Sequence, residues 1–518
     1  MATLTDPPTR GDGPAALTGQ ERFDDLRGRI GLWLGPLLFG VVLLTADGLE
    51  WPQRALAAIF ALVIVWWISE ALPLAVTAIF AVLMCVFMGV GDEETVLGAF
   101  GNDTIFTFLG GFVVARSMTV HGLDRRLALK LLSSSSIVRS PARTVIAFGG
   151  MAALISAFVS NTATVAMLFP IGVGIVLAVS RISQADGGPD LSRSRWATAM
   201  MLMIAYGASI GGLLTPVGAP HQLIGRDLVE KQTGETISFV EWVLMFAPIV
   251  LVMFVVLAFV LLLLNRPEVK ELRGAEEYVA QQRQEIGGFS RGEANTLVAF
   301  AAAVTLWTLP GVLSIVIGED SAPVTWLTEH VTEGVAAVFA ATLLFVLPLP
   351  RAASGGRRSA TLTWSEAVKI DWGVILLFGA GTVIGKLSFE TGLARVLGDG
   401  LAEKTGVSSL VAITILAAVT ALLVSETTSN TASAGIVVPI VVPIAVAAGV
   451  DPLIPGLVAT AAAGYGFMLP VSTPPNAIVY GSGMVPLTKM LRSGIVFDVL
   501  GMVVLVTGVL LVAPLVGL

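Results

Sequence analysis

Apolar segments long enough to cross a lipid bilayer recur from residue 31 to the end of the 518-residue chain. A helix needs roughly 20 apolar residues to cross the hydrocarbon core. Charged residues make up only 13% of the sequence, against roughly 25% in soluble domains. We therefore expect an all-α polytopic membrane protein, in which the 55 Gly and 26 Pro residues allow close helix packing and broken helices.

Eleven segments have the length of one crossing, near residues 31–48, 54–71, 73–90, 103–123, 197–228, 240–264, 294–317, 331–349, 372–394, 455–485 and 494–516. Two further segments, 144–180 and 408–448, are too long, because about 37 helical residues would span roughly 55 Å, nearly twice the hydrocarbon core. Each has a polar patch at its middle, Ser160-Asn161-Thr162 or Ser429-Asn430-Thr431. Each is therefore predicted to fold back at this patch as a re-entrant helical hairpin.

Lys and Arg residues are distributed unevenly between the connecting segments. They gather in residues 1–28, around the first hairpin and in the linker 266–292, whereas the loops 91–102 and 318–330 contain none. The positive-inside rule then places the N-terminus in the cytoplasm, and we expect the chain in the cell's inner (plasma) membrane. The first hairpin would enter from the cytoplasm and the second from outside.

The two halves of the chain share an ordered series of motifs. The two Ser-Asn-Thr patches correspond, and Ala219-Pro220-His221 is paired with Pro474-Pro475-Asn476. Each half has an odd number of crossings, so the second repeat is expected to be inverted, as in many secondary transporters. The predicted organisation is a cytoplasmic tail (1–28), a first transmembrane helix (29–50), repeat 1 (51–265), a cytoplasmic linker (266–292) and repeat 2 (293–518).

The polar patches and the Pro-rich breaks are candidates for an ion and anion site. A helix break at membrane depth must be buried or wet, because unsatisfied backbone groups in hydrocarbon are costly. Hydroxyl, amide and carbonyl oxygens suit Na⁺, while N–H groups and helix N-termini favour an anion. Simple helix capping is the alternative for one patch, but two corresponding patches entering from opposite faces favour a binding site.

The two Ser-Asn-Thr hairpins, the Thr473-Pro474-Pro475-Asn476 break and the Gly-rich run from Gly207 to Gly218 resemble the divalent anion/sodium symporter family of INDY-like carriers, from about residue 50 to the C-terminus. The resemblance implies Na⁺-coupled symport of di- or tricarboxylates such as succinate, malate or citrate. It also implies a homodimer in which a transport domain slides like an elevator against a scaffold domain.

The resemblance also implies site residues, carried over by motif position. The first Na⁺ site would use Ser156, Ser160, Asn161 and the Gly218 carbonyl, and the second Ser425, Thr428, Asn430 and the Ser472 carbonyl. The substrate would contact Ser160, Asn161, Thr162, Ala219, Pro220, Ser429, Asn430, Thr431, Thr473 and Pro474.

The first break departs from the family pattern of a hydroxyl residue followed by Pro-Pro-Asn. Ala219 lacks the hydroxyl, and His221 is interpreted as the replacement for Asn. This leaves open a Na⁺-independent or H⁺-linked anion exchanger, or a carrier of sulfate or another inorganic anion. With one cysteine, Cys85, and no nucleotide loop, metal-ligand cluster or nucleophile motif, neither an enzyme nor a nucleic-acid partner is expected.

Overall fold

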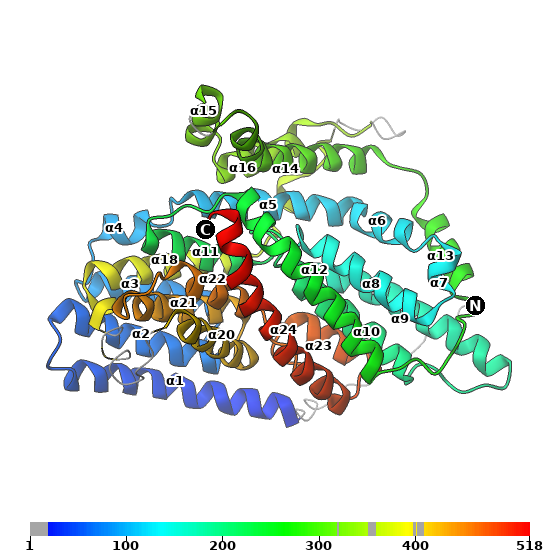
Figure 1. Cartoon of the computed structure of the whole chain (residues 1–518), viewed down its shortest axis with the longest axis horizontal. Coiled ribbons are helices and arrows are strands. Elements are labelled where there is room, and N and C mark those ends of the chain that lie inside the picture. Colours follow the sequence, from blue (N-terminus) through cyan, green and yellow to red (C-terminus); the bar gives the residue numbers. More distant parts are fainter. Residues whose placement is uncertain (1–18, 319–320, 351–358, 397–399, 401–408) are drawn as a thin grey trace, which may run out of the picture.

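The computed structural model describes residues 19–318, 321–350, 359–396, 400 and 409–518 (Figure 1). Most of the predicted tail and position 408, where the second predicted hairpin starts, lie outside the described residues. The regular elements of the described part are helices, apart from one isolated β-bridge between Pro348 and Ala360. The predicted all-α fold class is confirmed.

The helices of the first half run from α1 to α12: α1 (Gly19–Thr45), α2 (Trp51–Ser69), α3 (Leu74–Phe87), α4 (Glu93–Gly98), α5 (Asp103–His121), α6 (Leu123–Leu131), α7 (Ser135–Val138), α8 (Pro141–Ser156), α9 (Asn161–Ala185), α10 (Arg195–Gly211), α11 (Pro220–Thr233) and α12 (Phe239–Leu264). Helix α1 begins ahead of the predicted boundary at residue 29, so residues 19–28 are helical rather than part of a tail. Its membrane-competent part is Asp25–Thr45.

The remaining helices begin in the linker: α13 (Ala275–Ile286), α14 (Arg291–Ile317), α15 (Ala322–His330), α16 (Glu333–Val346), α17 (Trp364–Ala367), α18 (Trp372–Glu390), α20 (Leu410–Thr427), α21 (Asn430–Ala447), α22 (Leu453–Ala462), α23 (Pro474–Gly481) and α24 (Leu487–Val516). The order of the second half repeats that of the first. A helical hairpin (α8/α9 or α20/α21) is followed by a broken helix (α10/α11 or α22/α23) and then by one long helix (α12 or α24).

Ten helices of the described part are long and apolar enough to cross a bilayer, or eleven if α15 and α16, bent by 71° between them, count as one span. The number agrees with the prediction, but the members differ. The hairpin helices α9, α20 and α21 qualify, whereas α3 is short and the predicted crossings 197–228 and 455–485 are each divided by a break. The expected loops 91–102 and 318–330 contain the short helices α4 and α15.

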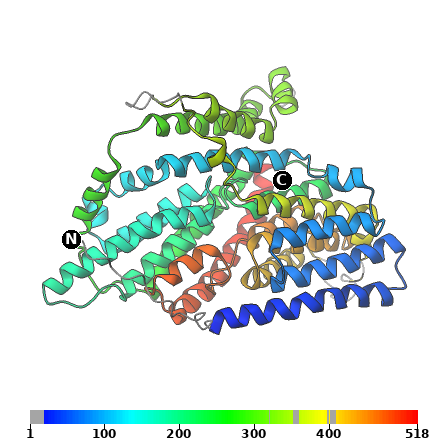
Figure 2. The ribbon, with the colours of Figure 1, turned by 180° about the vertical axis from the view of Figure 1, so that it is seen from behind.

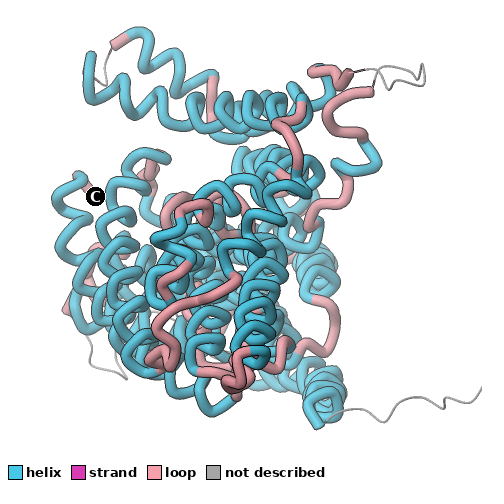
Figure 3. The backbone as a smooth tube through the Cα atoms, turned by 90° about the vertical axis from the view of Figure 1, so that its right-hand side faces the viewer, coloured by secondary structure: helices cyan, strands magenta, loops and turns pink. Residues whose placement is uncertain are grey.

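The two hairpins reach the middle of the molecule from opposite ends (Figures 1 and 2). Helices α14, α15 and α16 form an outer layer on one side (Figure 3). This layer packs closely on α5, because a side-chain carbon at Gly110 would come within 2.2 Å of the Ala337 carbonyl carbon in α16. Such close backbone approach at small residues is typical of helices packed within membranes.

Helix α10 lies at the centre of the fold, and every residue from Trp196 to Gly211 is buried. It packs on α8 through small residues. A side-chain carbon at Gly207 would lie 2.9 Å from the Gly149 carbonyl oxygen, and one at Gly211 would lie 2.2 Å from that of Ala153. Because α8 leads directly into the first hairpin tip, this contact fixes the tip against the first broken helix.

Candidate functional site

Both hairpin tips are helix N-termini. Ser160 is the N-cap of α9, and its hydroxyl oxygen accepts the N–H of Ala163 at 3.3 Å. Ser429 is the N-cap of α21, and its hydroxyl accepts the N–H of Ala432 at 3.2 Å. Serine is a preferred N-cap because its oxygen satisfies an N–H group that has no partner within the helix. The Ser-Asn-Thr sequence thus starts a helix in the middle of each long apolar segment.

A cavity of about 790 Å³ lies where the two tips meet. The structure brings together at this cavity all the predicted substrate-binding residues: Ser160, Asn161, Thr162, Ala219, Pro220, Ser429, Asn430, Thr431, Thr473 and Pro474. They come from four segments that are far apart in the sequence. The two tips therefore face one shared space rather than the surrounding lipid.

Four helix N-termini converge on this cavity. Their N-cap residues are Ser160, Ala219, Ser429 and Thr473, which begin α9, α11, α21 and α23. The N-terminus of a helix carries the equivalent of about +0.5 elementary charge. Four of them supply about +2, which is the charge needed to balance a divalent anion.

The first tip and the first break gather oxygen atoms. The Ser156 hydroxyl lies 2.6 Å from Asn161 Oδ1. A side-chain carbon at Gly218 would lie 2.7, 2.9 and 3.0 Å from the carbonyl oxygens of Gly212, Ala157 and Ser156. Three of the predicted Na⁺ residues, Ser156, Asn161 and Gly218, thus lie together, and sequence reasoning missed the Ala157 and Gly212 carbonyls. The fourth, Ser160, uses its hydroxyl to cap α9.

A second oxygen group forms at the other tip. The Ser425 hydroxyl lies 3.1 Å from Asn430 Oδ1 and 2.7 Å from the carbonyl oxygen of Ala463. One hydroxyl proton cannot serve both acceptors, so at least one oxygen pair lacks a proton between its members. The structure thus brings Ser425 and Asn430 together as predicted, and adds the Ala463 carbonyl. Ala463 is the C-cap of α22, as Gly212 is of α10.

The other two residues predicted for the second Na⁺ site use their hydroxyls elsewhere. The Thr428 hydroxyl donates to the Val424 carbonyl at 2.9 Å. The Ser472 hydroxyl contacts the carboxylate of Glu426 at 2.5 Å. The protons of these two hydroxyls therefore point away from the Ser425–Asn430 oxygen group.

The two helix breaks align one residue away from the predicted pairing. Helix α11 begins at Pro220 after the N-cap Ala219, and α23 begins at Pro474 after the N-cap Thr473. The predicted pairing of Ala219 with Pro474 is therefore wrong, because Ala219 takes the N-cap position that Thr473 has in the second half. Motif letters alone suggested the wrong register because both breaks contain Pro.

The corrected register changes the interpretation of His221. It corresponds to Pro475, and Gln222 corresponds to Asn476, so the prediction that His221 replaces the Asn is wrong. Gln222 Nε2 lies 2.7 Å from His221 Nε2. Asn476 Nδ2 instead donates at 2.7 and 2.9 Å to two carbonyls of its own break, those of Gly466 and Leu469.

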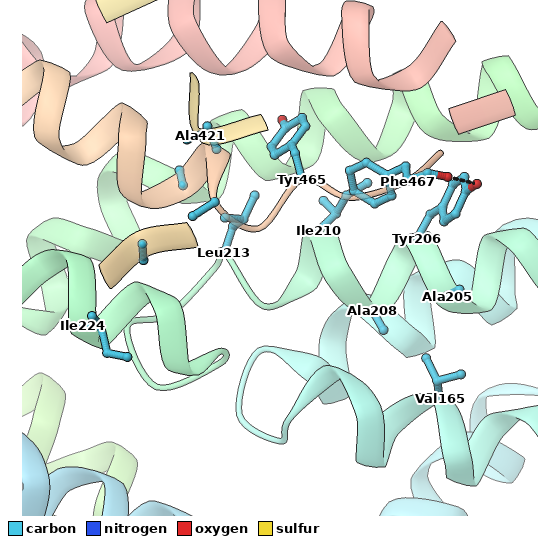
Figure 4. Close-up of a cluster of buried hydrophobic side chains, with 14 of the residues drawn as sticks. Val165, Ala205, Tyr206, Ala208, Ile210, Leu213, Ile224, Ala421, Tyr465 and Phe467 are labelled. Carbon is cyan, nitrogen blue, oxygen red and sulfur yellow. Dashed lines mark hydrogen bonds between the residues drawn. The ribbon is translucent and has the colours of Figure 1, made fainter. Parts of the chain in front are cut away.

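The two broken helices pack on each other through buried aromatic residues (Figure 4). The Tyr206 hydroxyl in α10 donates to the Phe467 carbonyl in the second break at 2.5 Å. The Tyr465 hydroxyl donates to the Gly501 carbonyl in α24 at 3.0 Å. The first bond joins the central helix of the first half to the break of the second, and the second bond joins that break to α24.

Two basic residues that the sequence did not assign to the site, Arg116 and Lys369, also line the cavity. Both pair with Glu366, at 2.5 Å and 2.6 Å. The hydrogen bonds from Lys369 and then Arg116 hold the pKa of the Glu366 carboxyl below its usual value. The available sequence signal was an arginine inside an apolar segment.

The oxygen groups at the tips are hydroxyl, amide and carbonyl groups, which are hard ligands. Among the residues that the structure describes, no three His, Cys, Asp or Glu side chains form a metal-binding group. Hard oxygen ligands suit cations such as Na⁺ rather than transition metals. The site can therefore place hard cations beside an anion.

Comparison with known proteins agrees with this arrangement. The family profile described as the sodium:sulfate symporter transmembrane region matches residues 35–518. The sodium-dependent dicarboxylate transporter SdcS of Staphylococcus saprophyticus is 35% identical over 494 residues, 94% of this chain and 92% of that protein. SdcS of Staphylococcus aureus is 33% identical over 491 residues, 94% of this chain and 91% of that protein.

Two solved structures resemble this fold. MtrF of Neisseria gonorrhoeae, reported as one of a class of antimetabolite efflux pumps, has a TM-score of 0.51 at 10% identity, covering 91% of this chain and 96% of that one. The YdaH transporter of Alcanivorax borkumensis has a TM-score of 0.50 at 13% identity, covering 88% and 97%. From the family match and the SdcS relatives, we conclude that this chain is a multi-pass membrane protein of the sodium:sulfate symporter family.

Proposed function

We propose that this protein is a Na⁺-dependent transporter of small dicarboxylates. The observation that carries the proposal is the convergence of four helix N-termini and both Ser-Asn-Thr tips on one cavity. The similar SdcS proteins are named sodium-dependent dicarboxylate transporters. A transporter needs a site that neutralises a dianion without holding it as tightly as fixed charges would, and partial helix charges meet this need.

The dianion would lie between the tips. Asn161 and Asn430 can each donate through Nδ2, while Thr162 and Thr431 add hydroxyl groups. The Thr473 hydroxyl caps its own helix by accepting the N–H of Asn476 at 3.2 Å, and its proton stays available to a carboxylate. These neutral donors suit both ends of a short dicarboxylate.

Two Na⁺ sites are proposed, one in each oxygen group. The first would use Ser156, Asn161 and backbone oxygens near Gly218, and the second Ser425, Asn430 and the Ala463 carbonyl. Each Asn would present Oδ1 to the cation and Nδ2 to the anion, so that binding of the two is coupled. Bound Na⁺ supplies positive charge beside the dicarboxylate in a poorly solvated site.

For the transport movement we propose an elevator mechanism in a homodimer with cytoplasmic N-termini. The Tyr206 hydroxyl links the first broken helix to the second break, and the α8–α10 contact links it to the first hairpin. The Ser425 hydroxyl, which donates to the Ala463 carbonyl, links the second hairpin to the second break. Helices α14 and α16 pack with one face of α5 around a second apolar cluster, which includes Val114, Ala303 and Ala337. The first group would move as one body against the second.

The test is uptake of labelled succinate into proteoliposomes that contain the purified protein. We expect uptake that depends on an inward Na⁺ gradient and disappears when K⁺ or choline replaces Na⁺. Succinate exchange that needs preloaded anion but no Na⁺ would contradict the proposal and favour the exchanger. Competition by sulfate stronger than by malate would favour an inorganic anion carrier.

The double variant Asn161→Ala/Asn430→Ala serves as the matched negative control in the same liposomes. It removes only the two tip amides, so its content in the membrane should equal that of the wild type. Uptake that persists in this variant would show that the measured flux does not pass through the proposed site.

A further inference from the structure

A buried carboxylate lies behind the second hairpin tip. Glu426 is the residue after Ser425 and is only 4% exposed. Its Oε1 accepts the backbone N–H of Met468 at 2.9 Å, and its Oε2 contacts the Ser472 hydroxyl at 2.5 Å. These two donors stabilise one negative charge on Glu426 and join the end of α20 to the second break.

A second carboxylate faces the first. Asp498 lies in the middle of α24, is 2% exposed, and interacts directly with the Glu426 carboxyl. Among the described residues, no N–H or hydroxyl group donates a hydrogen bond to either of its oxygens. Two buried carboxylates side by side repel each other, at a cost of several kcal/mol or more, so the pair needs either a shared proton or a cation between its members.

Within the described residues, no basic side chain is among the groups that interact with Asp498. The buried tyrosines Tyr206 and Tyr465 lie within electrostatic reach of Asp498. Their hydroxyl protons go to the carbonyls of Phe467 and Gly501. On α24 itself the nearest basic residue, Arg492, lies more than one turn away and is exposed. No ion pair to Asp498 or Glu426 occurs among the described residues.

We propose that Glu426 and Asp498 form a third Na⁺ site, distinct from the two sites at the tips. The cation would be the missing partner of Asp498, while the Met468 N–H and the Ser472 hydroxyl continue to stabilise the charge of Glu426. Two carboxylates and nearby backbone oxygens are ligands that hard cations prefer. Neither residue lines the substrate cavity, so the ion would bind behind the tip rather than against the anion.

This third site rests on the proposed function. It adds to that function a path by which a bound Na⁺ would affect substrate binding, because the carboxylate pair is connected to the substrate cavity through the chain. Glu426 follows Ser425 in α20, and its partner Ser472 precedes Thr473, which lines the cavity. An ion that neutralises the carboxylate pair would hold α20, α24 and the second break together. The geometry of Ser425 and Thr473, and hence affinity for the dicarboxylate, would depend on its presence.

The test compares Asp498→Asn with a matched control, Asp47→Asn, in which the same change is made at an 82% exposed side chain. The first measurement is the thermal unfolding midpoint of purified protein against Na⁺ concentration, with choline keeping ionic strength constant. We expect the Na⁺ concentration for half-maximal stabilisation to rise at least about tenfold in Asp498→Asn, as for loss of a metal-ligand contact. It should not change in Asp47→Asn.

The second measurement is the Na⁺ dependence of succinate uptake, whose Hill coefficient should fall by about one in Asp498→Asn. An unchanged Hill coefficient together with an unchanged thermal curve would overturn the site. The site would also be overturned if Asp498→Asn abolished the pH dependence of uptake but left its Na⁺ dependence unchanged. That result would mean that Glu426 and Asp498 share a proton rather than a Na⁺ ion.

If Asp498→Asn does not fold, the third site is tested by measuring the transport stoichiometry of the wild-type protein. The reversal potential of succinate flux gives the ratio of Na⁺ to succinate, which should exceed by one the two ions expected at the tips. A ratio of two with strict Na⁺ dependence would overturn this third site and leave the proposed function standing. Uptake by the wild type without Na⁺ would overturn the proposed function itself.

Discussion

The two halves of the site have the same architecture but different chemistry at their helix breaks. In the second break, Thr473 caps α23, and Asn476 holds two break carbonyls. In the first break, Ala219 offers no hydroxyl, and Gln222 lies against His221. The hairpin tips, by contrast, are nearly identical. Both halves thus use the same Ser–Asn pair at the tip, whereas the different side chains at the breaks can change which ligand binds.

The largest expected effect is the loss of either tip asparagine. Asn161→Ala and Asn430→Ala each remove one donor and one acceptor next to a buried serine hydroxyl. Such losses cost about 1–3 kcal/mol each, so we expect uptake to fall by about 100-fold or more in both variants. Initial rates of succinate uptake, normalised to protein in the liposomes, measure this. A normal rate in one variant alone would show that the tips are not functionally equivalent.

The next largest effect is expected at Thr473, the N-cap of α23, which has a hydroxyl where Ala219, the N-cap of α11, has none. Thr473→Ala removes a hydroxyl that caps α23 and faces the cavity, and a lost cap costs about 1 kcal/mol. We expect the half-saturating succinate concentration to rise about fivefold.

The reciprocal change, Ala219→Thr, restores the hydroxyl that the first break lacks. It should alter the relative uptake of succinate, citrate and sulfate. If the anion preference stays the same, position 219 does not contact the ligand.

A smaller effect is expected from making the first break resemble the second. The double change His221→Pro/Gln222→Asn would give the first break the Pro-Pro-Asn sequence of the second. In the second break, the Asn476 amide donates to two backbone carbonyls. We expect the half-saturating Na⁺ concentration to fall about threefold, which corresponds to less than one hydrogen bond. The Na⁺ dependence of uptake measures this, and a large rise would show that His221 itself takes part in binding.

The smallest effect is expected at the base of the first hairpin, where Arg139 Nη2 pairs with Glu276 of the linker helix at 2.8 Å. Hydrogen bonds from Ser135 and then Arg139 lower the pKa of the exposed Glu276 carboxyl. Because the folded-state pKa is lowered, this pair contributes stability above the unfolded value near 4.5 and loses it as pH falls further. Glu276→Gln should therefore change uptake at neutral pH by less than about twofold. A larger loss would mean that the linker controls the hairpin.

The sequence predicted the hairpins and their tips well, since both depend on local signals. An apolar segment too long for one crossing with Ser-Asn-Thr at its centre has few alternatives to a fold-back, and Ser160 and Ser429 do cap helices there. Sequence reasoning placed the breaks less accurately. The second break begins at residue 463, well before the predicted Thr473-Pro474-Pro475-Asn476 break, because Gly464 and Gly466 end α22 before the first proline is reached.

By itself, the sequence determined the membrane fold and the paired hairpins, because length, polarity and capping act within a few residues. The residues expected at the cavity came from the resemblance to the divalent anion/sodium symporter family, by motif position. Only the tertiary structure decided the partners between segments. It showed that His221 does not replace Asn476, that the Gly212 and Ala463 carbonyls join the oxygen groups, and that Asp498 faces Glu426. Contacts of this kind depend on how helices distant in sequence pack together, which no local pattern specifies.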